Sequence, residues 1–371
     1  MLTALEALER LGAAQPARHL ALVRAWDSAL LLVRRTPFAA SDLAAIGRFA
    51  EEFAFDLGWY PGMPREAADR FNLLGEPVFF DGVTALAGPD RSAFVADHAF
   101  DIRPARDDRP YFHDFFRWRA LPALWAVARQ GNAGLLDWGW PLQLATLAVA
   151  VLAALVLILL PARLLAGRTD GGLRRATAAY FLLIGVGFMF IEIATLQRLV
   201  LLLGQPVHAF AATLAAFLIF AGLGSGMAAR LKLAEGGGRL LGSLDLAVLA
   251  TAGLALLHAL AAPCLLTIGA GLATIPRGAL VLVLVAPLAF AMGLPFPLVL
   301  ARLKVTVPSL VPWAWGVNGC ASVIAAVLAG LLAMSVGARS VLLLGVLAYA
   351  LAAVAQRRLG CSLAEGGAPE R

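Results

Sequence analysis

The stretch "YFLLIGVGFMFIEIATLQRLVLLLGQPVHAFAATLAAFLIFAGLGSGMAARL", residues 180–231, sets the class of this protein. It holds two apolar runs joined by "GQP", and each exceeds the roughly 20 residues that a helix needs to cross the hydrocarbon core of a bilayer. A surface helix of a soluble protein carries a broad polar face, which neither run has. The stretch therefore predicts two consecutive transmembrane helices.

Similar runs recur over the second half of the chain. Hydrophobic residues make up 61% of the sequence and charged residues 15%, against about 25% charged in soluble domains. The fold class predicted is a mainly α, polytopic helical membrane protein with about seven transmembrane helices, preceded by a partial α/β, Rossmann-like soluble segment. The spans are expected at residues 139–161, 176–203, 206–229, 244–262, 278–301, 311–335 and 339–356, with 262–276 as a possible re-entrant or interfacial piece.

Charge separates two parts of the chain. Residues 1–138 hold 15 of the 30 Lys and Arg residues and 18 of the 24 Asp and Glu residues, so this part is near −3 and the remainder near +9. Basic loops beside apolar spans are typical of contact with anionic lipid and cytoplasm. The sequence pI of 9.8 therefore indicates a lipid bilayer as partner rather than nucleic acid.

The positive charges also predict an orientation. Eleven Lys and Arg residues fall on one set of loops and five on the other. The positive-inside rule places the C-terminus in the cytoplasm and the N-terminal segment outside, unless the first apolar run does not cross. The expected location is the bacterial inner membrane, as a multi-pass protein.

The soluble segment reads as helix, strand, strand, helix, strand. Residues 2–12 repeat Leu and Ala at helical spacing, "HLALVRAW" and "SALLLVRR" look like adjacent strands, Ser41 is a candidate N-cap, and "FDLGWYPGM" looks like a third strand. Short helices are expected in "REAADRFNLL" and "DRSAFVADHAF". The segment is too short to close a doubly wound sheet and has no signal peptide, so we expect the tail of a larger domain.

These motifs together resemble a known family. The stretch 180–231, "AMGLPFPLVL", "PWAWGVNGCASVIAAVLAGLLAMSVGARSVLLLGVLAYALAA", the soluble stretch from residue 19 to 63 and "RPARDDRPYFHDFFRW" are similar to bacterial integral-membrane spermidine synthase-like proteins. In these, a Rossmann-type aminopropyltransferase or methyltransferase-like domain is fused to transmembrane helices. The resemblance covers residues 18–355 and implies a C-terminal portion of such a protein.

The cofactor motifs of that family are not found in the sequence. The resemblance implies an S-adenosylmethionine-type donor held by a Gly-rich turn after a soluble strand. Here the one Gly-x-Gly-x-Gly string, Gly222, Gly224 and Gly226, follows a transmembrane run. We interpret Gly222 and Gly226 as a helix-packing face, and we expect this chain to bind no cofactor unless an upstream domain exists.

Glu192 is the acid that lies well inside a predicted span. A carboxylate in hydrocarbon is costly by about 2–3 kcal/mol on insertion scales, so it needs a partner or a proton. Candidate partners are Gln197, Arg198, His208 and Asn318. The sequence leaves open a proton, cation or amine site and a structural hydrogen bond.

Two further motifs contain other residues that are candidates for lining a membrane cavity. In "MGLPFP", Pro295 and Pro297 remove two backbone donors and predict a broken helix, which is either a plain kink or a substrate site. In "PWAWGVNG", Trp315 is an interfacial anchor or a cation-binding face, and Asn318 is expected to hydrogen-bond another helix. His208 is expected as a polar loop cap. No spacing of His or Cys indicates a metal site.

Asp107 and Asp108 open the stretch "DDRPYFHDFFRW". They are candidates for a catalytic base or an amine site, and the aromatics that follow Pro110 favour a docking segment at the bilayer surface. The domains predicted are a partial α/β domain at 1–106, an aromatic joint at 107–138, a transmembrane domain at 139–356 and a polar tail at 357–371.

Three functions follow as expectations. The first is an integral membrane protein of the spermidine synthase-like family that is not catalytically competent alone, because aminopropyl or methyl transfer needs the absent cofactor motifs. The second is a transporter or channel-like module for a small cation or polyamine. The third is a structural or assembly subunit.

Overall fold

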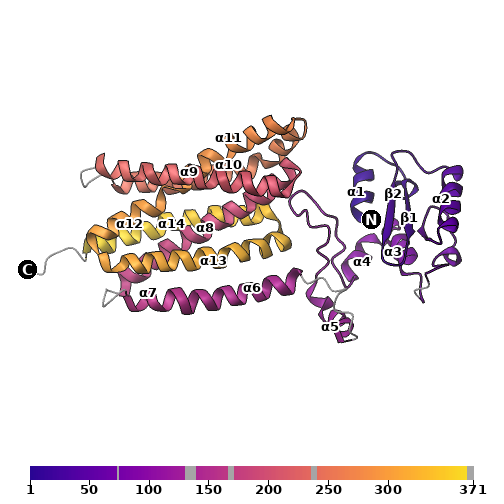
Figure 1. Ribbon diagram of the computed structural model, residues 1–371, viewed down its shortest axis with the longest axis horizontal. Helices are drawn as coiled ribbons and strands as arrows, with labels where there is room; N and C mark the ends of the chain where they lie inside the picture. The colour runs from indigo at the N-terminus through magenta and orange to yellow at the C-terminus, as the bar shows by residue number, and fades with distance from the viewer. Residues whose placement is uncertain (73–74, 130–138, 166–170, 235–239, 366–371) are drawn as a thin grey trace, which may run out of the picture. The chain divides into compact units, whose positions relative to one another are not determined.

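The computed structural model describes residues 1–72, 75–129, 139–165, 171–234 and 240–365 (Figure 1). The chain forms two compact units. The first holds Met1–Arg106 and Tyr111–Asp137, and the second holds Asp107–Pro110 and Trp138–Arg371. The predicted joint is therefore shared between the units, and its residues 130–138 lie outside the described residues.

The described part of the first unit contains a three-stranded antiparallel sheet. Its strands are β1 (Leu20–Arg24), β2 (Ala29–Val33) and β3 (Asp56–Trp59), in the order β2-β1-β3. β1 is buried along its whole length, whereas the edge strand β2 exposes Leu30 and Val33 by more than half. The three strands predicted from the sequence are confirmed.

Five helices complete the described part of the first unit: α1 (Leu2–Arg10), α2 (Ala40–Glu52), α3 (Val78–Ala87), α4 (Arg91–Asp97) and α5 (Leu121–Arg129). The core joins α1, β1, β3 and α3 through Leu5, Leu20, Trp59 and Leu86. α3 was not predicted, because its polar residues are too few to show a helical period.

Two predictions in this unit are wrong. Ser41 is not an N-cap: α2 begins at Ala40, and the Asp42 carboxylate accepts the amide of Ala39 at 2.9 Å, which with the Arg34 charge lowers the pKa of Asp42. In "REAADRFNLL", the described residues 65–72 form only the 3-10 turn Arg65–Ala67, and residues 73–74 lie outside the described residues. A helix cannot continue there because Asp69 has a positive φ of 54°.

In its described residues the second unit contains seven helices that are long and apolar enough to cross a membrane, the number predicted from the sequence. They are α6 (Gly139–Ala153), which continues through a π-helical turn at Ala154–Leu159 into α7 (Leu160–Leu165), α8 (Gly171–Leu203), α9 (Pro206–Ala234), α10 (Leu240–Ala270), α11 (Thr274–Met292) with α12 (Pro295–Thr306), α13 (Val311–Val336) and α14 (Ala338–Glu365). The protein is thus mainly helical.

α8 is the central helix of this unit. It packs against α13 and α14, while α9 packs against α11 and α10 lies between α11 and α14 (Figure 1). Tyr180 and Phe181 of α8 are fully buried, whereas Leu157, Leu218 and Val283 expose 70% or more of their surface. An apolar exterior around a packed interior is what a hydrocarbon environment requires.

Two boundaries differ from the prediction. The segment 262–276 is no re-entrant piece, because α10 continues to Ala270 and α11 begins at Thr274. Residues 357–365 are not a separate tail, because α14 continues to Glu365; residues 366–371 lie outside the described residues. Apolar sequence continues past the predicted end of the span at 244–262, whereas α14 continues through polar residues such as Arg357 and Arg358, and no proline interrupts either extension except Pro263.

Candidate functional site

The predicted break in the fifth span is present, and close backbone packing surrounds it. α11 ends at Met292 and α12 begins at Pro295. A Cβ atom at Gly293 would collide with the carbonyl of Ala221 on α9, and one at Gly224 would collide with the carbonyl of Phe290. Two helix backbones can approach this closely only where side chains are absent.

This corrects the packing role predicted for Gly222 and Gly226. A Cβ atom at either position would meet no atom within 4 Å, so neither glycine is needed for a close helix contact. Gly224, midway between them, is the glycine that packs. The sequence of the motif alone does not show which of the three glycines faces a neighbouring helix.

The broken helix is hydrogen-bonded to α8 and contacts α13 through aromatic rings, and α13 is itself hydrogen-bonded to α8. The Tyr180 hydroxyl donates to the carbonyl of Pro295 at 3.2 Å, and the Asn318 amide donates to the carbonyl of Phe181 at 3.0 Å. Phe296 stacks edge-on against both Phe181 and Trp315, with centroid distances of 5.3 and 4.9 Å. The predicted residues Pro295, Trp315 and Asn318 are therefore brought together around the start of α12, and Pro297 lies in the same first turn.

The members of this cluster contact one another at the start of α12. Trp315 exposes 57% of its surface, so its indole lies at the outside of the unit rather than in an interior cavity. Asn318 is the interhelical hydrogen-bond donor that its sequence context predicted. The arrangement fixes a kink between three helices.

Glu192 lies further along α8. It follows Gly185 by seven residues, or two helical turns, so it is on the same side of α8 about 10 Å away. A Cβ at Gly185 would meet Asn318 and Ala321, so this side faces α13. Glu192 is 9% exposed, and its carboxylate forms no hydrogen bond or ion pair with any described residue.

None of the partners proposed for Glu192 forms a bond to it among the described residues. Arg198 pairs with Asp108, and Asn318 bonds Phe181. His208 is exposed in the first turn of α9, and the buried Gln197 oxygen has no partner among the described atoms. Glu192 is thus a nearly buried acid without a described partner.

Asp108 caps a helix of the second unit. Its carboxylate accepts the amide of Arg339 at 2.7 Å and pairs with Arg198 at 3.4 Å, while its carbonyl accepts the amide of Ala338 at 2.9 Å. α14 begins at Ala338, so Asp108 satisfies amides that a helix start leaves free.

The residue before α14 makes room for this cap. Gly337 has a φ of 92°, and a Cβ there would collide with the Asp108 carboxylate. Asp107 is exposed and forms no bond to a described residue. Of the two acids, Asp108 therefore has a structural role at the start of α14, and the catalytic and docking interpretations of the pair stay predictions.

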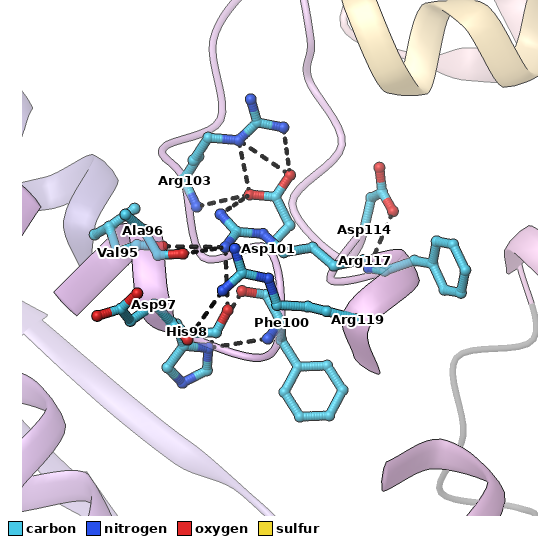
Figure 2. Close-up of polar contacts among 11 residues, drawn as sticks. Val95, Ala96, Asp97, His98, Phe100, Asp101, Arg103, Asp114, Arg117 and Arg119 are labelled. Carbon is cyan, nitrogen blue, oxygen red and sulfur yellow. Dashed lines mark hydrogen bonds and ion pairs between the residues drawn. The ribbon is translucent and has the colours of Figure 1, made fainter. Parts of the chain in front are cut away.

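In the first unit, a cluster of arginines surrounds the carboxylate of Asp101 (Figure 2). Arg103 binds Asp101 through two nitrogens, at 2.9 and 2.6 Å, and this pairing raises the pKa of Arg103. The Arg117 guanidinium approaches Asp101 at 3.6 Å and donates to the carbonyls of Val95, Ala96 and His98.

The arginines of this cluster cap α4. Arg119 donates to the carbonyl of Asp97, the last residue of that helix, at 3.3 Å. Cations at the C-terminus of a helix complement its dipole and its unpaired carbonyls. Asp101 is buried and neutralised, so it braces the fold; no sequence spacing pointed to it.

The aromatics after Pro110 line a cavity. Tyr111, Phe112 and Phe115 belong to the first unit and border a hollow of about 520 Å³, together with apolar residues of α1 and α3. Their predicted position at a bilayer surface stays a prediction.

At the end of β1, Arg24 makes a buried network that the sequence did not reveal. Its guanidinium bonds Asp56 at 3.0 Å and Asp69 at 2.8 Å. Burial raises the pKa of Asp56, but hydrogen bonds from Phe71 and Asn72 and the charge of Arg24 outweigh it, so the pKa lies below its ordinary value of 3.8.

In the part of the chain that the structure describes, no three His, Cys, Asp or Glu residues gather as a metal site would require.

Comparison of the chain with protein-family models, curated proteins and solved structures found no match.

Proposed function

We propose that this chain is a multi-pass membrane protein of the spermidine synthase-like class, whose helical unit anchors a soluble group-transfer domain. The observation that supports this most is the set of bonds that Asp108 makes to α14 and α8. Asp108 lies in "DDRP", within the stretch that resembles the closing segment of the enzyme domain, and it caps α14 and pairs with α8. The same short segment thus carries the soluble motif and a bond to the helices.

The chain alone does not transfer an aminopropyl or methyl group in this proposal. Its one Gly-x-Gly-x-Gly string lies inside α9, where the backbone amides are used in the helix, and Gly224 packs against α11. Such glycines do not form the turn that holds a nucleoside donor.

Isothermal titration of the purified protein with S-adenosylmethionine, and separately with its decarboxylated form, tests this. We expect no saturable heat at micromolar concentrations. Micromolar binding would contradict the proposal that this chain alone is not catalytically competent.

A reading frame that continues upstream into a soluble strand followed by a Gly-rich turn would support the proposed class, and a stop codon directly upstream would count against it.

A second candidate function rests on Glu192, whose buried carboxylate has no described partner. Acids inside a membrane helix commonly mark the path of a proton or cation. We propose passage of a small cation or polyamine along this side of α8. In reconstituted vesicles, Glu192→Gln should abolish polyamine or proton flux, whereas Asp245→Asn, which removes an acid bonded to Gln356 at 3.2 Å, should leave it. Unchanged flux in Glu192→Gln would remove this candidate.

A further inference from the structure

A groove runs between α8 and α14 at one end of the second unit. α8 contributes small residues there at spacings of three and four, and α14 contributes apolar side chains. The lining consists of Gly172, Arg175, Ala176, Ala179, Leu183, Leu351, Val354, Ala355 and Arg358, around a volume of about 600 Å³. The groove exists because the small residues of α8 leave space that neighbouring side chains do not fill.

The lining has two different ends. Leu183 and Leu351 lie toward the middle of the helices, and Leu351 and Val354 are exposed on the apolar exterior. Arg175 and Arg358 lie near the first residue of α8 and the last turns of α14, and both are exposed. The groove is therefore apolar where the bilayer core would be and basic where headgroups would be.

The charge at the basic end is suited to an anion. None of the lining residues is acidic. Arg175 uses its Nε to donate to the carbonyl of Gly171 at 3.2 Å, and its two terminal nitrogens make no bond to a described residue. The positive end of the α8 dipole lies at the same place.

We propose that this groove binds an anionic phospholipid, with its phosphate between Arg175 and Arg358 and an acyl chain along Ala176, Ala179 and Leu351. Basic sites between transmembrane helices recognise such headgroups. An acyl chain would fill the volume that side chains leave, which a free phosphate would not. The end involved is the one that the positive-inside rule places in the cytoplasm.

Native mass spectrometry of the detergent-solubilised protein tests the headgroup. Wild type should retain phosphatidylglycerol in preference to phosphatidylcholine, and Arg175→Gln with Arg358→Gln should lower that preference by about tenfold or more, since each basic residue near a membrane surface contributes to anionic lipid binding. The charge-matched control, Arg302→Gln with Lys304→Gln, removes two positive charges outside the groove. An unchanged preference in the groove variant, or an equal loss in the control, would overturn the proposal.

Two further arms test the acyl chain. Ala179→Leu fills the groove and keeps both arginines, so it should also lower phosphatidylglycerol retention. Inorganic phosphate at millimolar concentration should fail to displace the lipid from wild type. Full retention in Ala179→Leu, or displacement by phosphate alone, would show that the arginines bind a free anion and not a lipid.

Discussion

Asp56 and Glu192 are both buried acids, one in each unit, and their surroundings are opposite. Asp56 is fully buried and accepts hydrogen bonds from Phe71, Asn72 and Arg24. Glu192 is 9% exposed and has no partner among the described residues. A buried carboxylate that has hydrogen bonds and a counter-charge is compatible with a stable fold, whereas a buried carboxylate without partners destabilises the fold and therefore suggests a functional role. The contrast separates structural acids from candidate site acids.

The largest effect should follow from breaking the network of Asp56. Arg24→Ala leaves Asp56 and Asp69 buried without a counter-charge, and we expect a loss of about 3–5 kcal/mol in the stability of the first unit. Hydrogen exchange of the β1 and β3 amides in the full chain measures it. Arg70→Ala is the control, because the Arg70–Glu51 pair is exposed on both sides and should contribute less than about 1 kcal/mol. Equal effects would show that burial does not distinguish the two pairs.

Asp108 lies between these extremes, since it has partners but is half exposed. Asp108→Ala removes the cap of α14, and we expect about 1–2 kcal/mol less protection of the first turn of that helix in hydrogen exchange. Asp108→Asn should cost less, because the amide oxygen still accepts from Arg339 while the charge facing Arg198 is lost. If both variants behave alike, the charge rather than the cap holds the segment.

Acid should weaken the first unit through Asp56. Its pKa is lowered on folding, so its stabilisation is fully present above about pH 4 and is lost as the pH falls through the lowered pKa. Hydrogen exchange of β3, corrected for intrinsic rates, should therefore show protection falling below about pH 4. Asp56→Asn should flatten that dependence, and the same steepness in the variant would assign it to other carboxylates.

The smallest expected effect is that of Glu192→Gln on stability. Because the carboxylate has no described partner, neutralising it removes an unfavourable buried group, and the thermal midpoint in detergent should stay level or rise. A fall comparable to that of Asp108→Ala would reveal a bonding partner and would make Glu192 structural after all.

The membrane unit was largely predictable because bilayer thickness sets the length of its helices and hydrocarbon sets their composition. The strands were predictable from apolar runs of strand length. The sequence could not show which residues far apart in the chain bond to one another. Asp108 and Arg339 are 231 residues apart, and nothing local to "DDRP" or "VGARS" indicates that one caps the other. Likewise, the glycine string around Gly224 was recognisable as a motif, but it did not show which glycine packs against α11.

The path of the chain has a practical consequence for proteolysis. The backbone passes between the two units after Arg106, after Pro110 and after Asp137. A single cut between the described part of α5 and the first long apolar helix would therefore leave the first unit still covalently joined to Asp107–Pro110. Asp108 is bonded to α8 and α14, so the nicked pieces should remain together until the protein is denatured.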